Sequence, residues 1–416
     1  MTVVVGAQWG DEGKGRVVDY MAEQADMVIR FQGGDNAGHT VVNERGRFAL
    51  HLIPCGIFHP HVRCVLGAGT VVNPDTVTEE IGTLQSAGVD TGNLWIDLRA
   101  HLIWPYHRLL DGAEEDRRRR ESAAAGQGEA MGTTRRGIGP VYADKHSYNG
   151  IRAGDLLHPD MLRQRLEMIL PLKNRELAFY DLTQFTVEEC MSLAGGWRAQ
   201  HGQRIVDTLP WLRDAVRDDR RLLLEGQLGV GRDVDWGIYP YTTGSSPTAG
   251  GASVGAGIPP RAIGEVLGVV KAYSTSVGGG PFPTELHDDY GAMLQEIGHE
   301  YGATTGRERR CGWFDGVAIS YASWLNGFTG IAVTKLDVLD HFAEIKLCTA
   351  YRLAGKVIDF VPDTATQSLV EPVYETWAGW QTDTSGCRSW EDLPAAARAY
   401  LRRIEQLASA PVRFVS

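Results

Sequence analysis

Residues 3–15 constrain the fold more than any other part of this sequence. Three valines lead into a turn in which Gly6, Gly10, Gly13 and Gly15 surround an acid pair and a lysine. A strand that enters a glycine-rich turn and then a helix is typical of a loop that binds phosphate. The glycines let backbone N–H groups point inward, and the helix start adds a partial positive charge. A tight turn with a surface lysine is the alternative, but such a turn rarely needs four glycines.

The loop is close to the nucleotide-binding pattern GxxxxGK[ST], with one difference. Gly15 stands where that pattern has the hydroxyl side chain that binds Mg²⁺. Another group must therefore hold the metal, and Asp11 inside the loop is the candidate because Mg²⁺ prefers oxygen ligands. Lys14 supplies a mobile cation for the outer phosphates. We therefore expect this loop to bind nucleotide phosphates, with Asp11 as a metal ligand.

Short apolar runs recur along the chain, and glycine or polar residues end each of them. They are rich in Val, Ile and Leu, as strands buried on both faces of a parallel sheet tend to be. Apolar residues at helical spacing lie between some of them. We therefore predict an α/β fold with a large, mostly parallel open sheet, flanking helices and a nucleotide site like that of P-loop NTPases. The strands are expected at residues 3–6, 27–31, 63–67, 222–226 and 330–334, and helices at 76–84, 288–301 and after Pro394.

Residues 1–416 are expected to form a single domain, since neither an internal repeat nor a long low-complexity linker divides them. Two stretches, near residues 106–150 and 244–260, have the composition of mobile loops over a site. Surface excursions without a role are the alternative for both. The first stretch contains four consecutive arginines with acids on both sides, which favours a solvated face over a nucleic-acid patch.

Composition argues against several classes of partner. A net charge of −11 disfavours non-specific binding to nucleic acid or to acidic lipid. No stretch approaches the roughly 18 apolar residues of a membrane span, and no signal-peptide pattern precedes the first valines. The six cysteines stand singly, without the CxxC spacing of metal sites, so reduced thiols are expected. The expected location is the cytoplasm.

A second glycine cluster, residues 32–40, follows the strand predicted at residues 27–31. If this strand neighbours the first one, both glycine loops meet at one edge of the sheet. His39 in the second loop could then donate a proton or a hydrogen bond to a phosphoryl group. A single histidine is more often structural, but its place beside a phosphate loop favours catalysis.

Two further segments suit a reaction coupled to a nucleotide. Residues 302–310 gather hydroxyl and guanidinium groups, which can grip carboxylate or phosphate. Thr334, Lys335 and Asp337 end the last predicted strand in a pattern with which many GTP-binding proteins read guanine. The carboxylate accepts from two N–H donors of the base. Four residues alone are a weak signal, and the phosphate loop strengthens it.

Along nearly its whole length the sequence resembles the adenylosuccinate synthetase family. The resemblance rests on many motifs in the family's order, which makes chance similarity implausible. They include the phosphate loop and the segment Gly280-Pro281-Phe282-Pro283-Thr284-Glu285-Leu286. The others are residues 33–40, 51–54, 132–134, 137–140, 239–241, 248–251, 302–307 and 334–340.

The resemblance implies a homodimeric, GTP- and Mg²⁺-dependent ligase that joins L-aspartate to the 6-position of IMP through a 6-phosphoryl intermediate. It implies that Asp11 is the base that takes the N1 proton, and that His39 is the acid that stabilises the moving phosphoryl group. Asp11 and the Gly38 carbonyl would bind the metal. The implied GTP contacts are Gly10, Glu12, Gly13, Lys14, Gly15, Thr40, Lys335, Asp337 and Ser416. The implied purine monophosphate contacts are Asn36, Thr134, Thr243, Leu228 and Tyr148, and the implied aspartate contacts are Thr304, Thr305, Arg307 and Arg309.

The departures from the family's pattern fall mainly on the IMP side. Leu228 stands where the family has a glutamine near the purine 6-oxygen, and Gln227 points the other way if the strand is extended. Tyr148 stands where an arginine reaches across the dimer to the 5′-phosphate, which leaves Arg152 or the arginines of residues 135–136 as substitutes. Asp35 adds an acid beside the purine contacts.

Two loops also differ. The loop at residues 243–247 departs from the family's Ser- and Asn-rich version. Ser416 is the one residue present of a family loop that helps to enclose the guanine, so a more open base pocket is expected.

Three interpretations follow from these departures. The first is an ordinary adenylosuccinate synthetase. The second is a paralogue that performs the same ligation on a modified purine nucleotide, either a 2-amino nucleotide or an IMP analogue of an antibiotic pathway. Retention of Asp11 weakens the 2-amino version, since phage-type relatives have a small residue there. The third is a GTP-binding regulator that has lost catalysis, against which Asp11, His39 and Arg307 speak. A dehydrogenase is excluded, because Val72 stands where its third glycine would be.

Overall fold

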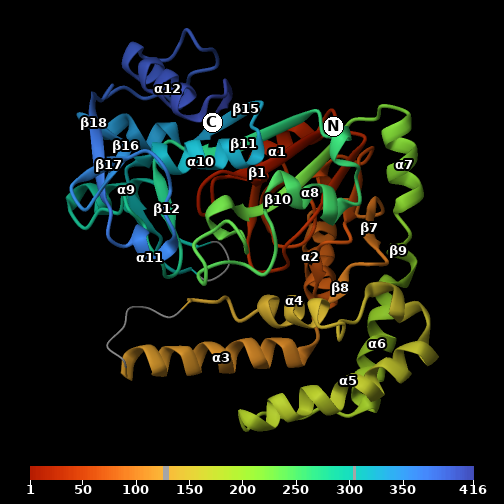
Figure 1. Ribbon diagram of the computed structural model, residues 1–416. Helices are drawn as coiled ribbons and strands as arrows, with labels where there is room; N and C mark the ends of the chain where they lie inside the picture. Colours follow the sequence, from red (N-terminus) through yellow and green to blue (C-terminus); the bar gives the residue numbers. More distant parts are fainter. Residues whose placement is uncertain (125–130, 303–305) are drawn as a thin grey trace.

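The centre of the molecule is a nine-stranded sheet whose neighbouring strands all run parallel. We describe it from a computed structural model that covers residues 1–124, 131–302 and 306–416. The strand order is β19-β15-β11-β1-β10-β2-β5-β7-β9 (Figure 1). These strands are β1 (Thr2–Gly6), β2 (Met27–Arg30), β5 (Arg63–Leu66), β7 (Leu94–Asp97), β9 (Ile205–Val206), β10 (Leu222–Gly229), β11 (Glu265–Lys271), β15 (Gly330–Thr334) and β19 (Val412–Val415). The predicted α/β class with a parallel open sheet is confirmed.

The five predicted strands correspond to β1, β2, β5, β10 and β15. They are mostly apolar because both faces of the sheet are covered, and the buried charges of Arg30 in β2 and Glu225 in β10 pair with each other. Val3 and Val5 join one hydrophobic core and Val4 joins the other, and all three are fully buried. The expectation that the first two strands are neighbours is wrong, because β10 pairs with both β1 and β2 and separates them. The two glycine loops still leave the same edge of the sheet.

Helices cover both faces of this sheet, and smaller sheets flank it. The helices are α1 (Lys14–Ala22), α2 (Pro74–Ser86), α7 (Leu209–Arg217), α8 (Ala249–Ala256), α9 (Asp289–Ile297), α10 (Gly316–Asn326), α11 (Thr364–Gln367) and α12 (Ala395–Ala408). The flanking strands are β3 (His39–Asn43), β4 (Gly46–Leu50), β6 (Val71–Val72), β8 (His101–Leu102), β12 (Ser274–Ser276), β13 (Arg310–Gly312), β14 (Phe314–Asp315), β16 (Glu344–Leu353), β17 (Lys356–Ile358) and β18 (Glu371–Ala378). The three predicted helices correspond to α2, α9 and α12. In α12 the predicted apolar face, which includes Leu401 and Ile404, is fully buried.

A separate helical layer lies below the sheet in Figure 1. It consists of α3 (Pro105–Ala124), α4 (Ile138–His146), α5 (Pro159–Phe179) and α6 (Val187–His201). Two of these helices occupy much of the region that composition assigned to a loop near residues 106–150. The second expected loop, residues 244–260, likewise contains α8, whose first turn Thr248 caps through Gly251 N.

The charged sequence of α3 explains why it looked like a loop. Arg117 pairs with Glu121, Arg118 with Glu114, and Arg119 with Glu115, all at a spacing of four residues. Such pairs stabilise an exposed helix without an apolar stripe. Over the described residues, no helix is both long and apolar enough to span a membrane.

Candidate active site

The loop between β1 and α1 closes around a carboxylate of its own. Glu12 is fully buried, and its Oε1 accepts hydrogen bonds from the backbone of Gln8 at 3.1 Å and of Gly10 at 2.9 Å. Its Oε2 lies 2.6 Å from Nζ of Lys14, which is also buried. Backbone N–H groups and an ammonium thus converge on one anionic group, as they do on a phosphate. The loop has the donors that the sequence predicted.

Gly15 is the second residue of α1 and lies at a point where a side chain does not fit. A Cβ atom on Gly15 would lie 2.8 Å from the Cβ of His39, which begins β3. The serine or threonine of the common P-loop pattern would therefore collide with His39. The absence of that hydroxyl follows from the packing of the second glycine loop against the first.

His39 lies in a buried ion pair with a residue of β10. Its Nδ1 is 2.5 Å from Oε1 of Glu225, while its Nε2 has no hydrogen-bond partner among the described residues. Burial, together with Arg30, lowers the pKa of His39 to about 4, against the opposing effect of Glu225. Burial alone would raise the pKa of Glu225, but its bond to His39 and the charge of Arg30 outweigh it and hold this pKa at about 2. The carboxylate therefore fixes the ring, and any anion brought to Nε2 would favour the imidazolium.

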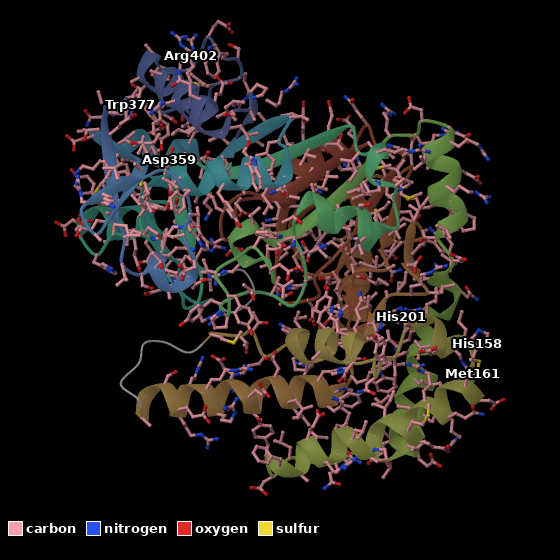
Figure 2. All side chains as sticks on the ribbon, in the orientation of Figure 1. His158, Met161, His201, Asp359, Trp377 and Arg402 are labelled. Carbon is pink, nitrogen blue, oxygen red and sulfur yellow. The ribbon has the colours of Figure 1, made fainter. Side chains whose placement is uncertain are left out.

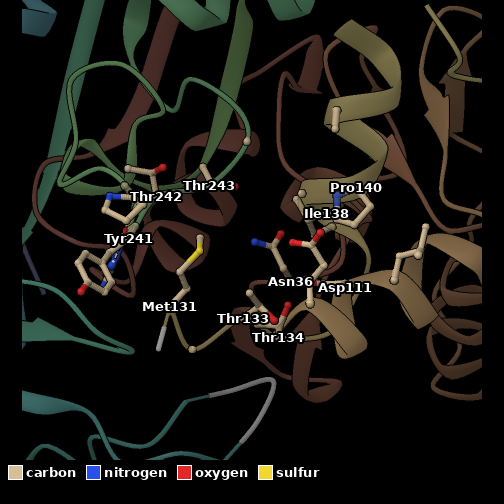
Figure 3. A pocket seen from close by; sticks show the side chains of 18 of the residues that line it. Asn36, Asp111, Met131, Thr133, Thr134, Ile138, Pro140, Tyr241, Thr242 and Thr243 are labelled. Atoms are coloured by element: carbon tan, nitrogen blue, oxygen red, sulfur yellow. Dashed lines mark hydrogen bonds between the residues drawn. The ribbon is translucent and has the colours of Figure 1, made fainter. Parts of the chain in front are cut away.

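A cavity of about 1340 Å³ opens beside the phosphate loop. Figure 3 shows side chains from several segments around it, among them Asn36 of the second glycine loop, Asp111 of α3, Thr133 and Thr134 before α4, and Tyr241 to Thr243. The cavity is somewhat larger than a typical site for one small molecule, so it has room for more than one ligand. Eight of the predicted site residues line it. They are Gly10, Asp11, Asn36, Gly38, Thr134, Leu228, Thr243 and Arg307.

Asp11 is held in place by a chain of alternating charges. Its Oδ2 accepts a hydrogen bond of 2.8 Å from Nε of Arg309, whose Nη1 lies 2.6 Å from Glu300. Glu300 is fully buried and also binds Nζ of Lys271 at 2.7 Å. Arg309, predicted as an aspartate contact, therefore binds Asp11 and Glu300. The Asp11 backbone is left-handed, with φ of 60°, which turns its side chain toward the cavity.

The two departures near the purine contacts have clear structural outcomes. Gln227 is fully buried, and its Nε2 donates to the carbonyl of Gly34 at 2.6 Å, so it points away from the cavity as predicted. Leu228 lines the cavity with a left-handed φ of 59°, where the pairing of β1 and β10 shifts register. Asp35 is also buried and accepts from Asn73 at 3.0 Å, which places it away from the cavity lining.

The predicted guanine-reading residues lie at the same sheet edge. Thr334 Oγ1 donates to the carbonyl of Glu12 at 2.6 Å, which joins the end of β15 to the phosphate loop. Lys335 has φ of 61° and donates to the carbonyl of Gly298 at 2.8 Å, while Asp337 is exposed. Ser416 N donates to the carbonyl of Val333 at 2.8 Å. The fold thus brings the last residue of the chain beside the guanine motif.

Some predicted residues lie elsewhere. Tyr148 is 91% exposed and does not line the cavity, although its neighbours Ser147 and Asn149 do. Thr40 lies in β3, half-buried, next to His39. Thr304 and Thr305 lie outside the described residues.

The sequence reasoning missed three charged residues of this site. Glu225 positions His39, and Glu300 positions Arg309. Arg232 lines the cavity, and burial together with Arg310 lowers its pKa to about 10. Glu225 follows three leucines of a predicted buried strand, which is a signal that could have identified it, since buried charges are rare without a partner. Glu300 stands among polar residues of the sequence and gave no such signal.

Comparisons with known proteins agree with this geometry. The model of the family described as "Adenylosuccinate synthetase" matches residues 3–416. The chain is 47% identical over 98% of its length to the adenylosuccinate synthetase of Dehalococcoides mccartyi, covering 95% of that protein. It is 48% identical to that of Heliobacterium modesticaldum, covering 98% of this chain and 94% of the relative.

Solved structures give the same result. The fully ligated adenylosuccinate synthetase of Plasmodium falciparum superimposes with a TM-score of 0.92 at 36% identity, over 100% of this chain and 96% of that one. A cyanophage S-2L succinoaminodeoxyadenylate synthetase, bound to dGMP and dATP, shares the fold with a TM-score of 0.56 at 23% identity, over 81% and 85% of the two chains. The protein belongs to the adenylosuccinate synthetase family of GTP-dependent ligases.

Proposed function

We propose that the cavity binds IMP and L-aspartate and that the phosphate loop binds GTP, so that the chain forms adenylosuccinate. One observation carries this assignment: Asp11, Asn36, Thr134, Thr243 and Arg307 come from distant segments and line a single cavity beside the phosphate loop. The paralogue and regulator alternatives are not needed. The relatives at 47% and 48% identity are named adenylosuccinate synthetase, and the phage enzyme's 23% identity supports a shared fold alone.

Asp11 is proposed as the base. It lies at the cavity wall, with Oδ2 bound to Arg309, which leaves Oδ1 for the purine N1 proton. Loss of that proton lets the 6-oxygen attack the γ-phosphorus of GTP, and GDP leaves. The aspartate amine then displaces the phosphate from C6 and loses a proton. Phosphorylation is required because an oxo group is a poor leaving group.

His39 is proposed to stabilise the transferred phosphoryl group. In the structure its Nδ1 faces Glu225 and its pKa is about 4, so the ring is neutral near neutral pH. A phosphoryl anion at Nε2 would raise this pKa and bring a proton to Nε2. The imidazolium would then lie between two anions, with Glu225 holding its orientation.

Mg²⁺ is proposed to bind between the two loops. Asp11 and Gly38 line the same cavity and offer a carboxylate and a carbonyl oxygen, the ligand types that Mg²⁺ prefers. When bound, the ion would neutralise charge on the GTP phosphates. Because Gly15 has no hydroxyl, these two residues replace the usual P-loop ligand.

The remaining GTP contacts are proposed on the loops that follow β1 and β15, at the same edge of the sheet. Lys14 and the N–H groups of residues 10–15 would hold the phosphates once the Glu12 carboxylate has moved away from these donors. Lys335 and Asp337 would read the guanine, with Ser416 beside them and Thr40 near the phosphates. Thr334 physically links the two ends through its bond to Glu12.

Arg307 is proposed to bind the carboxylates of L-aspartate. It lines the cavity and donates to the carbonyl of Gly132 at 2.9 Å. Thr304 and Thr305 remain proposed contacts from sequence. Arg309 is better placed to hold Asp11 than to bind the amino acid directly.

A homodimer, with a single domain in each protomer and a cytoplasmic location, completes the proposal. Met161, Met168, Leu172 and Phe179 are exposed on α5 at intervals of seven and four residues, the spacing of a helix-packing seam. Figure 2 labels Met161 at the outer end of this helix. A second copy on the α5 layer would cover these side chains and bring Tyr148 toward its partner's cavity. Sedimentation of the wild type and of Met168→Glu tests this, and a monomeric wild type would exclude it.

The decisive experiment supplies GTP, Mg²⁺ and L-aspartate with IMP, dGMP and IMP analogues in parallel. Efficient turnover of IMP over the others is expected, while preference for another nucleotide would refute the acceptor assignment. Asp11→Ala should abolish turnover, and a fully active variant would overturn the proposed base. Asp359→Asn, at an exposed site outside the cavity lining, is the control.

A further inference from the structure

A buried group of three side chains with metal-ligating atoms lies behind the phosphate loop. Nδ1 of His39, Sγ of Cys55 and a carboxylate oxygen of Glu225 lie within 4.8 Å of one another. Sγ is 3.2 Å from Oε1 of Glu225 and 3.7 Å from Nδ1 of His39. Cys55 begins the short 3₁₀ helix η1 (Cys55–Phe58), so β3, η1 and β10 each supply one group.

We propose that this group binds a thiophilic divalent cation such as Zn²⁺ or Cd²⁺, and that the bound ion inhibits the enzyme. Imidazole, thiolate and carboxylate are the three ligand types that Zn²⁺ takes in proteins, and three protein ligands leave a fourth position for water. Mg²⁺ prefers oxygen ligands only and would not compete for a thiolate. The site is therefore separate in chemistry from the Mg²⁺ site proposed at Asp11.

The distances are close to those of a tetrahedral site. Metal–ligand bonds of about 2.0 to 2.3 Å place neighbouring ligand atoms about 3.3 to 3.7 Å apart. The two separations that involve Cys55 are 3.2 and 3.7 Å. The third, 2.5 Å between His39 and Glu225, is a hydrogen bond and must widen when an ion replaces the proton.

Each ion that binds releases one proton from the protein. The Cys55 thiol, whose pKa burial and Glu225 raise, loses its proton to solvent when the ion binds. The proton between His39 and Glu225 moves to Nε2, which gives the neutral tautomer with the ion on Nδ1. With the ion on Nδ1, the ring can no longer become the imidazolium that is proposed to stabilise the phosphoryl group. Inhibition rests on the catalytic role proposed for His39, whereas the binding itself does not.

One neighbouring charge opposes the ion. Nη1 of Arg30 lies 3.4 Å from Oε1 of Glu225, and Nη2 of Arg30 is anchored to the His51 carbonyl at 2.9 Å. This guanidinium leaves one uncompensated positive charge after binding. The site is therefore expected to fill reversibly as the metal concentration rises, and not to hold a permanent structural ion.

Binding can be measured without turnover. Wild-type protein with saturating Mg²⁺ and no nucleotide would be titrated with Cd²⁺, following the thiolate-to-metal charge-transfer absorption and the protons released. One equivalent and one proton per chain are expected. X-ray absorption of the Zn²⁺-loaded wild type should show one sulfur among nitrogen and oxygen ligands. Absence of a sulfur ligand, or of the absorption band, would overturn the site.

Two matched variants locate the ion and its effect. Cys55→Ser should lose the band and weaken inhibition by Zn²⁺ at least about tenfold relative to its own uninhibited rate. Cys387→Ser, at the most exposed thiol, should behave as wild type. A band retained in Cys55→Ser would place the ion elsewhere. Metal bound at Cys55 without loss of activity would keep the site and refute the role of His39 in its inhibition.

Discussion

Gly15 and His39 are packed so closely that a Cβ atom on the glycine would lie 2.8 Å from the histidine Cβ. Gly15 lies in the first turn of α1, and His39 starts β3. The contact ties the phosphate loop to the residue proposed to act on the phosphoryl group. One missing side chain thus couples the two glycine loops that the sequence shows separately.

Gly15→Ser should therefore damage catalysis and not merely add a metal ligand. The hydroxymethyl group would push His39 from its place, and a displacement of this size can cost about 10²-fold in kcat. The same substitution at Gly82 is the control, because a Cβ there meets nothing within 4 Å. Steady-state kinetics of both variants test the contact. A Gly15→Ser enzyme as active as the Gly82→Ser enzyme would contradict it.

Glu12→Gln should destabilise the protein in a way that nucleotide reverses. The change leaves buried Lys14 without its carboxylate, which costs about 3 to 5 kcal/mol for a buried pair. GTP phosphates would supply the missing charge, so GTP with Mg²⁺ should raise the unfolding temperature more in the variant than in the wild type. Thermal unfolding with and without GTP measures this. An equal shift in both proteins would show that the phosphates do not take the place of Glu12.

Stability in acid should depend on His101. Burial first, and then the charges of Lys145, Arg152 and Arg165, lower the pKa of His101 from 6.5 to about 3. His101 therefore takes up a proton near pH 6.5 in the unfolded chain but stays neutral in the folded protein. Its contribution to the free energy of unfolding is fully present above pH 6.5 and is lost as the pH falls toward 3. Between about pH 6.5 and 4.5 this group accounts for about 2 to 3 kcal/mol.

His101→Asn removes that dependence. Urea unfolding from about pH 7 to about pH 4.5 should show a shallower loss of stability in the variant than in the wild type. Some slope remains, because His39 is also held neutral by burial. Identical slopes would mean that His101 is protonated in the folded protein.

Local pattern was enough to predict the elements whose residues are buried on both faces. Residues 3–6 and 330–334 are short, apolar and ended by loops, and they form β1 and β15 as expected. The same reasoning missed the order of the strands, because the pairing of β10 with β1 and β2 joins residues about two hundred positions apart in the sequence. Glu225 reaches His39 only through that order.

Helix α3 shows the opposite error. Its apolar face ends near Leu110, so periodicity predicted no helix over the charged part, although three pairs of opposite charge at a spacing of four residues were visible. Site residues on the phosphate loop were predictable because a turn needs glycines at fixed places. Site residues that act through partners on other segments, such as Glu300, which binds Arg309, could not be predicted in this way.

Leu228→Gln should test whether an amide at this position improves binding and turnover of the acceptor nucleotide. Leu228 lines the cavity, while the neighbouring Gln227 is committed to the Gly34 carbonyl. A glutamine at residue 228 would offer hydrogen bonds near the purine 6-oxygen, worth about 1 kcal/mol, and raise kcat/KM for IMP several-fold. Gln227→Leu, by contrast, should lower stability by removing a buried bond. A lower kcat/KM for IMP in Leu228→Gln would show that the apolar wall is part of this chain's own specificity.

Asp337→Asn should separate guanine recognition from catalysis. Asp337 is exposed, lies just past β15 and is not among the residues that line the cavity. A carboxylate that accepts from two N–H groups of guanine contributes equally to the ground state and the transition state, so its loss raises the KM for GTP and leaves kcat nearly unchanged. Replacement of a charged acceptor costs about 1.5 to 3 kcal/mol, or roughly 10- to 150-fold in KM. Asp359→Asn, at another exposed carboxylate (Figure 2), is the matched control and should keep the wild-type KM. A fall in kcat at saturating GTP would instead place Asp337 in the reaction itself.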